Sequence, residues 1–171
     1  MEHPQEHVIL GILMKKERHG YEIHHLFSSG LGRVWHAGIS QVYALLKRLE
    51  AAEKVSSIVE MQDNRPAKHI YSITPKGRDA FLHWVNAPLE RIRDLRLEFI
   101  AKLFLMRELK LPGIDELIRK QIHIFQEQLR DIKQKDAISA DEFDHLVFRF
   151  RIAQIETVIS WLRDCEQNFD H

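Results

Sequence analysis

Residues 40–75, SQVYALLKRLEAAEKVSSIVEMQDNRPAKHIYSITP, determine the fold that the sequence predicts. After Ser40, a residue type that often forms an N-cap, apolar positions recur with a helical period as far as about Glu53. The pattern then changes to that of a β-hairpin, with strands at 55–61 and 69–73 and a polar turn at 62–68. The stretch therefore predicts a helix followed by a hairpin with a basic tip.

The residues on either side of this stretch complete a winged helix-turn-helix. A first helix is predicted at 7–15, and Gly20 opens a second. Thr74 and Pro75 form an N-cap and a first helical residue, which predicts a fourth helix after the hairpin. In such a fold the third helix can enter the major groove of DNA, while a basic hairpin reaches phosphates or the minor groove.

Beyond Ala87 the sequence changes to long amphipathic patterns, which predict helices at 90–109, 114–135 and from Ser139 to about 168. Three long helices make a thin domain that leaves its apolar stripes uncovered, so we expect the last two helices to self-associate. The expected fold is mainly α. It has a winged helix-turn-helix with a two-stranded wing at 1–87, and an all-α dimerisation domain with a candidate effector site at 88–171.

The distribution of charge agrees with DNA binding but does not establish it. The formal net charge of the chain is +0, yet residues 33–78 contain eight basic and four acidic residues. On charge alone, scatter in a neutral protein explains this excess equally well. We expect phosphate contacts from the basic residues of the third helix and of the hairpin, which are Lys47, Arg48, Arg65 and Lys68.

Several other classes of protein are excluded. The single cysteine, Cys165, cannot form an internal disulfide, and no apolar run reaches the length of a membrane span, so we expect a cytoplasmic protein in a reducing compartment. No signature of a catalytic nucleophile or phosphate-binding loop is present, and we expect no enzyme. The histidines lack metal-ligand spacing, so neither a metal nor a cofactor is expected; they are His19, His24, His25 and His36.

Several segments resemble the PadR family of bacterial transcriptional regulators, in its longer form with a helical C-terminal domain. They are I-L-G-I-L at 9–13, H-G-Y-E-I at 19–23, W-H-A-G-I-S-Q-V-Y-A-L-L-K-R-L-E at 35–50, R-P-A-K-H-I-Y-S-I-T at 65–74 and K-G-R at 76–78. The segment L-E-F-I-A-K-L-F-L at 97–105 is similar to the start of that family's C-terminal domain.

The resemblance implies a homodimer that binds a palindromic operator in double-stranded DNA, in many relatives as a repressor and in one branch as an activator. Some relatives respond to aromatic ligands. On this resemblance the DNA contacts come from Ser40, Gln41, Tyr43 and Lys47 in the third helix and from Arg65 and Lys68 in the wing. Many relatives have proline where Ala44 stands and small residues around Gln41, so the operator sequence stays open.

Each candidate contact also has a plainer interpretation. Tyr43 either contacts DNA or packs against Trp35, and Tyr21 either helps the start of the second helix to hold a phosphate or serves as a capping or core residue. Lys47 and Arg48 are equally suited to a solvated helix face, and Arg65 to a simple turn.

Two functional alternatives stay open. The aromatic residues of the C-terminal half either line an effector pocket or form the core of a dimer; they are Phe125, Phe143, Phe150 and Trp161. The fold also serves as a protein-interaction module that does not bind DNA. Basic residues on both the third helix and the hairpin favour a DNA-binding regulator over that module.

Overall fold

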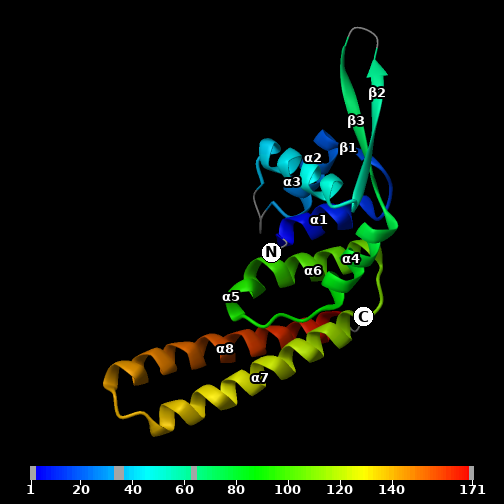
Figure 1. Cartoon of the computed structure of the whole chain (residues 1–171). Helices are drawn as coiled ribbons and strands as arrows, with labels where there is room; N and C mark the ends of the chain where they lie inside the picture. Colours follow the sequence, from blue (N-terminus) through cyan, green and yellow to red (C-terminus); the bar gives the residue numbers. More distant parts are fainter. Residues whose placement is uncertain (1–2, 33–36, 63–64, 170–171) are drawn as a thin grey trace. The chain divides into compact units, whose positions relative to one another are not determined.

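The computed structural model describes residues 3–32, 37–62 and 65–169 (Figure 1). Its elements are α1 (Pro4–Leu13), β1 (Arg18–His19), α2 (Gly20–Gly30), α3 (Ile39–Ala51), β2 (Val55–Gln62), β3 (Arg65–Ile73), α4 (Pro75–Asn86), α5 (Ile92–Asp94), the π-helix η1 (Leu95–Phe99), α6 (Ile100–Leu109), α7 (Ile114–Ile138) and α8 (Glu142–Phe169). These elements form two compact units, the first made of residues 1–87 and 96–111 and the second of residues 88–95 and 112–171.

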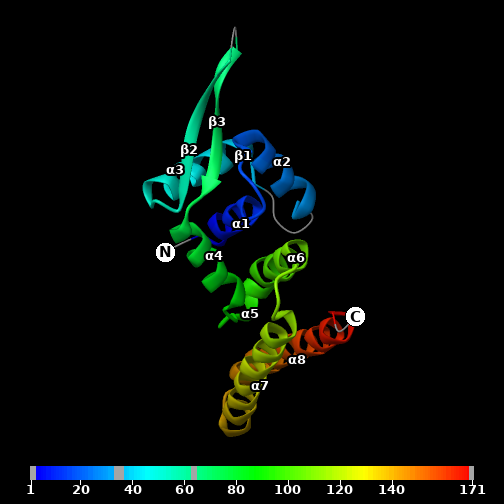
Figure 2. The same cartoon turned by 90° about the vertical axis from the view of Figure 1, so that its right-hand side faces the viewer.

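The first unit is a winged helix-turn-helix in which α1, α2, α3, α4 and α6 enclose one core. Its fully buried apolar side chains come from every one of these helices and include Ile9, Ile23, Phe27, Leu46, Phe81 and Met106. The strands form an antiparallel sheet in the order β1-β3-β2. The β2–β3 hairpin extends away from α1, α2 and α3 as the wing, which both Figure 1 and Figure 2 show.

The start of α4 is fixed to the end of α3 by the predicted N-cap. The Thr74 hydroxyl accepts a hydrogen bond from the Gly77 amide at 3.1 Å and donates one to the Glu53 carbonyl at 2.7 Å. A Cβ on Gly77 would lie 2.0 Å from the Lys54 carbonyl oxygen, so only glycine allows the backbones to approach so closely. This contact explains the glycine of the K-G-R segment.

Two helix starts differ from the sequence prediction. α1 begins at Pro4 rather than at residue 7, because proline is well suited to the first helical position and lacks the amide hydrogen that this position leaves unpaired. The prediction of Ser40 as an N-cap is wrong. Gly38 caps α3 in an extended conformation and its carbonyl accepts the Val42 amide at 3.1 Å, so Ser40 already lies in the first turn.

The predicted two-stranded wing is confirmed, but its turn is shorter than predicted and the sheet has a third strand. β2 and β3 pair from Val55 opposite Ile73 as far as Gln62 opposite Arg65, so most of the predicted turn belongs to strands. A third strand, β1, pairs Arg18 with Tyr71. Two residues are too few to display the alternation by which a strand is recognised in sequence.

The single helix predicted at 90–109 is divided into α5, η1 and α6, and its second half belongs to the first unit. Lys102 explains this placement. Its side chain is 1% exposed, and its Nζ donates to the Ala87 carbonyl at 2.7 Å and lies 3.4 Å from the Glu98 carboxylate. Glu98 in turn accepts the indole N–H of Trp84 at 2.6 Å. α6 is therefore enclosed, which accounts for apolar residues around most of its circumference.

The second unit is an antiparallel helical hairpin of α7 and α8 (Figure 1). Apolar residues between the two helices are buried, among them Ile118, Phe125, Ile155 and Leu162. Asp141 starts α8 because its carboxylate accepts the amides of Phe143 and Asp144, at 2.7 and 3.0 Å. None of the helices in the described part of the chain is both long and apolar enough to span a membrane.

Candidate nucleic-acid interface

The outward face of α3 is a short stripe of exposed side chains one helical turn apart. The stripe consists of Ser40, Tyr43, Ala44 and Lys47. The opposite face is anchored in the core by Val42, Leu45, Leu46 and Leu49. Because Ser40 is not the N-cap, its hydroxyl is unused and makes no hydrogen bond with any described residue. The helix therefore presents small, polar and basic groups, as a major-groove helix must.

Two of the predicted contacts lie on the flank of α3 that faces α1 instead. The Gln41 amide nitrogen donates to the side-chain oxygen of the buried Gln5 at 2.6 Å. The Arg48 guanidinium lies 3.0 Å from the carboxylate of Glu6, which is 8% exposed. Each side chain is held by a partner on α1, which competes with DNA for its donors. Gln41 and Arg48 therefore orient α3 on α1 in this structure.

Tyr21 and Tyr43 both lie near the start of α2. A Cβ on Gly20 would lie 2.6 Å from the Tyr43 ring, so the glycine of the H-G-Y-E-I segment makes room for that ring. Tyr21, half exposed, stacks on His19 with 5.6 Å between ring centroids. The His19 amide donates to the Glu22 carboxylate at 2.8 Å, which orders the first turn of α2.

The wing contributes Lys68 to the same surface. Its Nζ lies 5.7 Å from the centroid of the Tyr21 ring, within the range of a cation–π contact. Tyr21, Tyr43, Lys47 and Lys68 therefore mark one surface that runs from α3 over the start of α2 to the wing, and we call it the basic–tyrosine surface. The side chain of Arg65 lies outside the described residues, as does Trp35.

The third tyrosine of this region is buried behind the surface. Burial raises the pKa of the Tyr71 phenol, and the negative charge of Glu50 and the neighbouring Tyr43 act in the same direction. The phenol is therefore uncharged at neutral pH, and the positive charge of the surface comes from its lysines.

Two residues that position α3 beneath this surface were not predicted from the sequence. Gln5 and Glu6 are buried polar residues of α1, and their roles depend on α1 and α3 lying against each other. Their only signal in the sequence is the position of two polar residues directly before the apolar run of the first helix.

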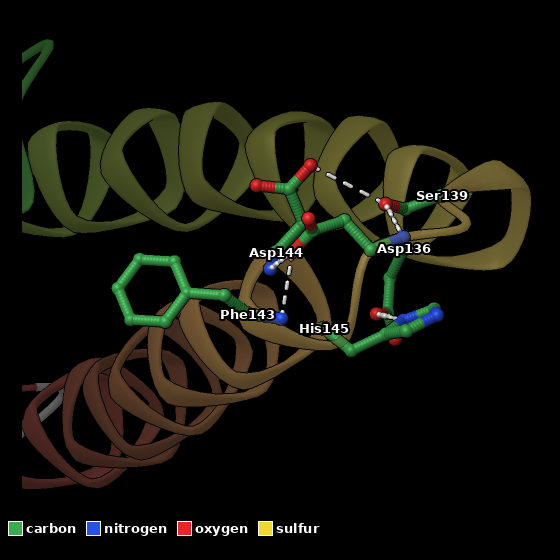
Figure 3. Close-up of polar contacts among 6 residues, drawn as sticks. Asp136, Ser139, Phe143, Asp144 and His145 are labelled. Carbon is green, nitrogen blue, oxygen red and sulfur yellow. Dashed lines mark hydrogen bonds and ion pairs between the residues drawn. The ribbon is translucent and has the colours of Figure 1, made fainter.

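The four aromatic residues predicted for an effector pocket have different environments. Phe125 is fully buried within the helical hairpin, whereas Phe143 and Phe150 are 69% and 63% exposed. Trp161 is intermediate. Figure 3 shows Phe143 pointing away from the polar contacts that join the ends of α7 and α8, where His145 and Asp136 pair at 2.6 Å.

Comparison with known proteins matches both halves of the chain to families. Residues 9–83 match the Transcriptional regulator PadR-like family, and residues 95–170 match the family Virulence activator alpha C-term. The Negative transcriptional regulator PadR of Bacillus subtilis (strain 168) is 27% identical over 171 residues, which cover 92% of each chain. The Probable transcriptional regulator Rv1176c of Mycobacterium tuberculosis is 32% identical over 90 residues, 53% of this chain and 48% of that protein.

Two solved structures are similar to the chain over most of its length. Bacillus subtilis PadR in complex with operator DNA is 25% identical, covers 95% of this chain and 96% of its own, and has a TM-score of 0.49. The protein smu.1604c from Streptococcus mutans UA159 is 26% identical, covers 93% and 96%, and has a TM-score of 0.48. The winged helix-turn-helix of the structure coincides with the matched segment, so residues 9–83 form a domain of the PadR-like family and the protein is a transcriptional regulator.

Proposed function

We propose that the protein is a repressor that binds a pseudo-palindromic operator as a homodimer in the cytoplasm. The observation that carries the proposal is the outward stripe of α3, in which Ser40, Tyr43 and Lys47 are exposed beside Tyr21 and Lys68. Lysines supply contacts to phosphates, whereas hydroxyl groups can also bind base edges. The name of the Bacillus subtilis relative, a negative regulator, supports repression.

The proposed dimer rests on the second unit. Five large apolar side chains near the α7–α8 turn are exposed, namely Ile138, Phe143, Leu146, Val147 and Phe150. A contiguous apolar surface of this kind on a two-helix hairpin is typical of a protein–protein contact. A twofold dimer would bury it against itself and place two winged helices on two half-sites, one helical turn of DNA or a multiple of it apart.

Sequencing of the genomic DNA fragments that the purified protein retains tests this proposal. We expect enrichment of a pseudo-palindrome, and we expect the double variant Tyr43→Ala, Lys47→Ala to lose it. Lys120→Ala is the matched control, because Lys120 lies on α7 and pairs with Glu116 at 2.7 Å. Retention of random fragments by all three proteins would exclude sequence-specific recognition.

Two alternatives have distinct signatures in the same experiment. A protein-interaction module would retain no DNA at all. An activator would retain the same type of pseudo-palindrome, but deletion of its gene would lower transcription of the adjacent genes instead of raising it. The match of residues 95–170 to the family Virulence activator alpha C-term is the reason to measure the direction of regulation.

We also propose that a small aromatic or apolar effector weakens operator binding. The effector site predicted from Phe125, Phe143, Phe150 and Trp161 stays a prediction. A cavity in the first unit is a better-formed candidate, with a volume of about 290 Å³ and an apolar lining that includes Ile12, Leu26, Phe104 and Leu105. Arg18 also lines it, and its buried Nε has no hydrogen-bond partner among the described residues.

Titration of phenolic acids during measurement of operator affinity tests the effector proposal. A ten-fold loss of affinity corresponds to a coupling free energy of about 1.4 kcal/mol, which is ordinary for allostery. Arg18→Met should remove the response if the first-unit cavity is the site, and Trp161→Phe should change it if the C-terminal aromatic residues are. A broad aromatic panel without effect on affinity would refute the proposal.

A further inference from the structure

A second cavity lies wholly within the second unit, between residues 90–93 and the facing sides of α7 and α8. Its volume is about 260 Å³, and its polar lining includes Arg91, Arg93, Arg151, Gln128 and Gln154. Glu90 is the single acidic residue of the lining, so three formal positive charges face one negative charge. This excess contrasts with the second half of the sequence as a whole, in which acidic residues outnumber basic ones.

The backbone that carries two of these arginines is held firmly against α7. The fully buried Gln121 binds both backbone groups of Leu89, accepting its amide at 2.6 Å and donating to its carbonyl at 2.8 Å. The Gln128 amide nitrogen donates to the Glu90 carbonyl at 2.8 Å. Three side-chain hydrogen bonds therefore fix the chain directly before Arg91, so the site is largely organised before any ligand arrives.

Two of the three guanidinium groups of the cavity have no carboxylate partner among the described residues. The side chains of Arg91 and Arg151 form no ion pair or hydrogen bond within the part of the chain that the structure describes. Arg93 has only a 3.6 Å contact between its Nε and the carboxylate of the adjacent Asp94.

Three lysines elsewhere on the same unit are paired. On α7, Lys120 and Lys135 each bind the carboxylate four residues before them at 2.7 Å, as solvated helix faces commonly do. On α8, Glu156 pairs with Lys133 at 2.7 Å. Among the described residues, Arg91 and Arg151 lack such a carboxylate partner, as do Arg149 and Arg163, but only Arg91 and Arg151 of these four line the cavity.

We propose that this cavity binds a small organic phosphate. A guanidinium presents two parallel N–H groups that match the oxygens of a phosphate, and a phosphoryl group carries close to two negative charges and three acceptor oxygens. A lone carboxylate would balance only half of the excess charge. Gln154 offers an amide to polar groups of the ligand, and Ile92 and Ile155 form an apolar wall for the remainder.

The position of the site in the chain gives it a regulatory consequence. The chain leaves the first unit after Ala87 and returns to it at Arg96, and two of the arginines lie in the segment between these points. A ligand that binds this segment acts next to two of the three covalent connections between the units. Phosphate binding itself does not depend on operator binding, so the two proposals can fail separately.

Calorimetric titration of the full-length protein with ribose 5-phosphate and with inorganic pyrophosphate, at constant ionic strength and without DNA, tests the site. We expect one saturable site per chain and at least a ten-fold loss of affinity in Arg151→Gln. Arg149→Gln is the matched control, because Arg149 is exposed on the same helix but does not line the cavity. Its affinity should stay within two-fold of the unmodified protein.

Four results would overturn the proposal. One is absence of saturable binding of either probe to a folded protein, and another is an equal loss in both variants, which would indicate general attraction to a basic surface. A third is a lower salt dependence of DNA binding in Arg151→Gln without any phosphate, which would assign the arginines to the DNA backbone. The last is a changed oligomeric state of that variant in sedimentation, which would assign them to the contact between copies.

Discussion

The two units differ in what their buried polar side chains bind and in how much apolar surface they leave exposed. In the first unit, Gln5 and Glu6 bind side chains of α3, and Lys102 binds the backbone at the end of α4. These buried polar groups position the exposed surface of the unit. In the second unit, Gln121 holds a single connecting segment, while large apolar side chains near the α7–α8 turn are exposed. The first unit encloses its own core, whereas we propose that a partner surface covers the exposed apolar side chains of the second.

The largest expected effect concerns the exposed apolar residues of the second unit and their proposed role in dimerisation. We expect the double variant Phe143→Asp, Phe150→Asp to be monomeric at concentrations at which the unmodified protein is a dimer. Burial of one phenylalanine contributes about 1.5–3 kcal/mol, and a twofold interface contains four of these rings, so dimerisation weakens by several orders of magnitude. Sedimentation equilibrium measures the change.

The control for this prediction is Arg149→Ala, an exposed polar position on the same helix. It should leave the dimer intact. Circular dichroism should show that the double variant keeps its helix content. A dimer that persists with both aspartates in place would mean that a different face of the chain associates.

The next largest effect concerns the stability of the first unit. Lys102→Met should lower the free energy of unfolding by about 3 kcal/mol, because it leaves the largely enclosed carboxylate of Glu98 without its cation. Chemical denaturation measures the loss. In the double variant Lys102→Met, Glu98→Gln the loss should be smaller than the sum of the two single effects, because the two residues form one pair.

The same lysine predicts a dependence on pH. Burial lowers the pKa of Lys102 below its ordinary value of 10.5, and the nearby Glu98 opposes this only in part. Between the lowered pKa and 10.5 the unfolded chain binds more protons at this site than the folded one, so its contribution makes stability rise with pH in that window. Lys102→Met should remove that rise, and an unchanged slope would contradict the assignment.

How well the sequence predicted each feature depended on how local its cause is. The N-cap at Thr74 is set by neighbouring residues and was predicted correctly. Ser40 was assigned wrongly because Gly38 competes for the same role two residues earlier. The partners of Gln41 and Arg48 could not be predicted, since Gln5 and Glu6 are far from them in sequence and close only after folding. β1 is too short to have a pattern of its own.

Two neighbouring substitutions on α3 distinguish a residue that positions the helix from one that contacts DNA. Arg48→Ala should destabilise the first unit by about 1–2 kcal/mol, because it leaves the buried Glu6 carboxylate without its partner. Lys47→Ala, on the outward stripe, should leave stability within about 0.5 kcal/mol. It should instead lower the salt dependence of operator binding by about 0.9 per lost phosphate contact, or about twice that in a dimer. The opposite assignment of the two effects would mean that Arg48 turns to the DNA.

The smallest expected effect is on sequence discrimination by Gln41, which was predicted from the sequence to contact DNA. A glutamine that reads a base is worth about 1–3 kcal/mol of discrimination. Here its amide nitrogen donates to Gln5 at 2.6 Å, so α1 fixes the orientation of the side chain and competes with a base for it. We therefore expect Gln41→Ala alone to change the ratio of operator to random-DNA affinity by less than about 1 kcal/mol.

The variant Gln5→Ala makes this last prediction decisive, because it releases the Gln41 amide without altering α3 itself. If Gln41 is able to reach a base, then Gln41→Ala should reduce discrimination more in the Gln5→Ala background than in the unmodified protein. If Gln41 only orients α3, the two substitutions should each cost about 1 kcal/mol of stability, less than additively, and leave discrimination untouched. Competition binding with operators substituted at single positions distinguishes these outcomes, since only base reading makes the loss depend on the identity of one base pair. If base reading is observed, the hydrogen bond between Gln41 and Gln5 contributes to the specificity of the protein, because it limits how much of α3 is available to DNA.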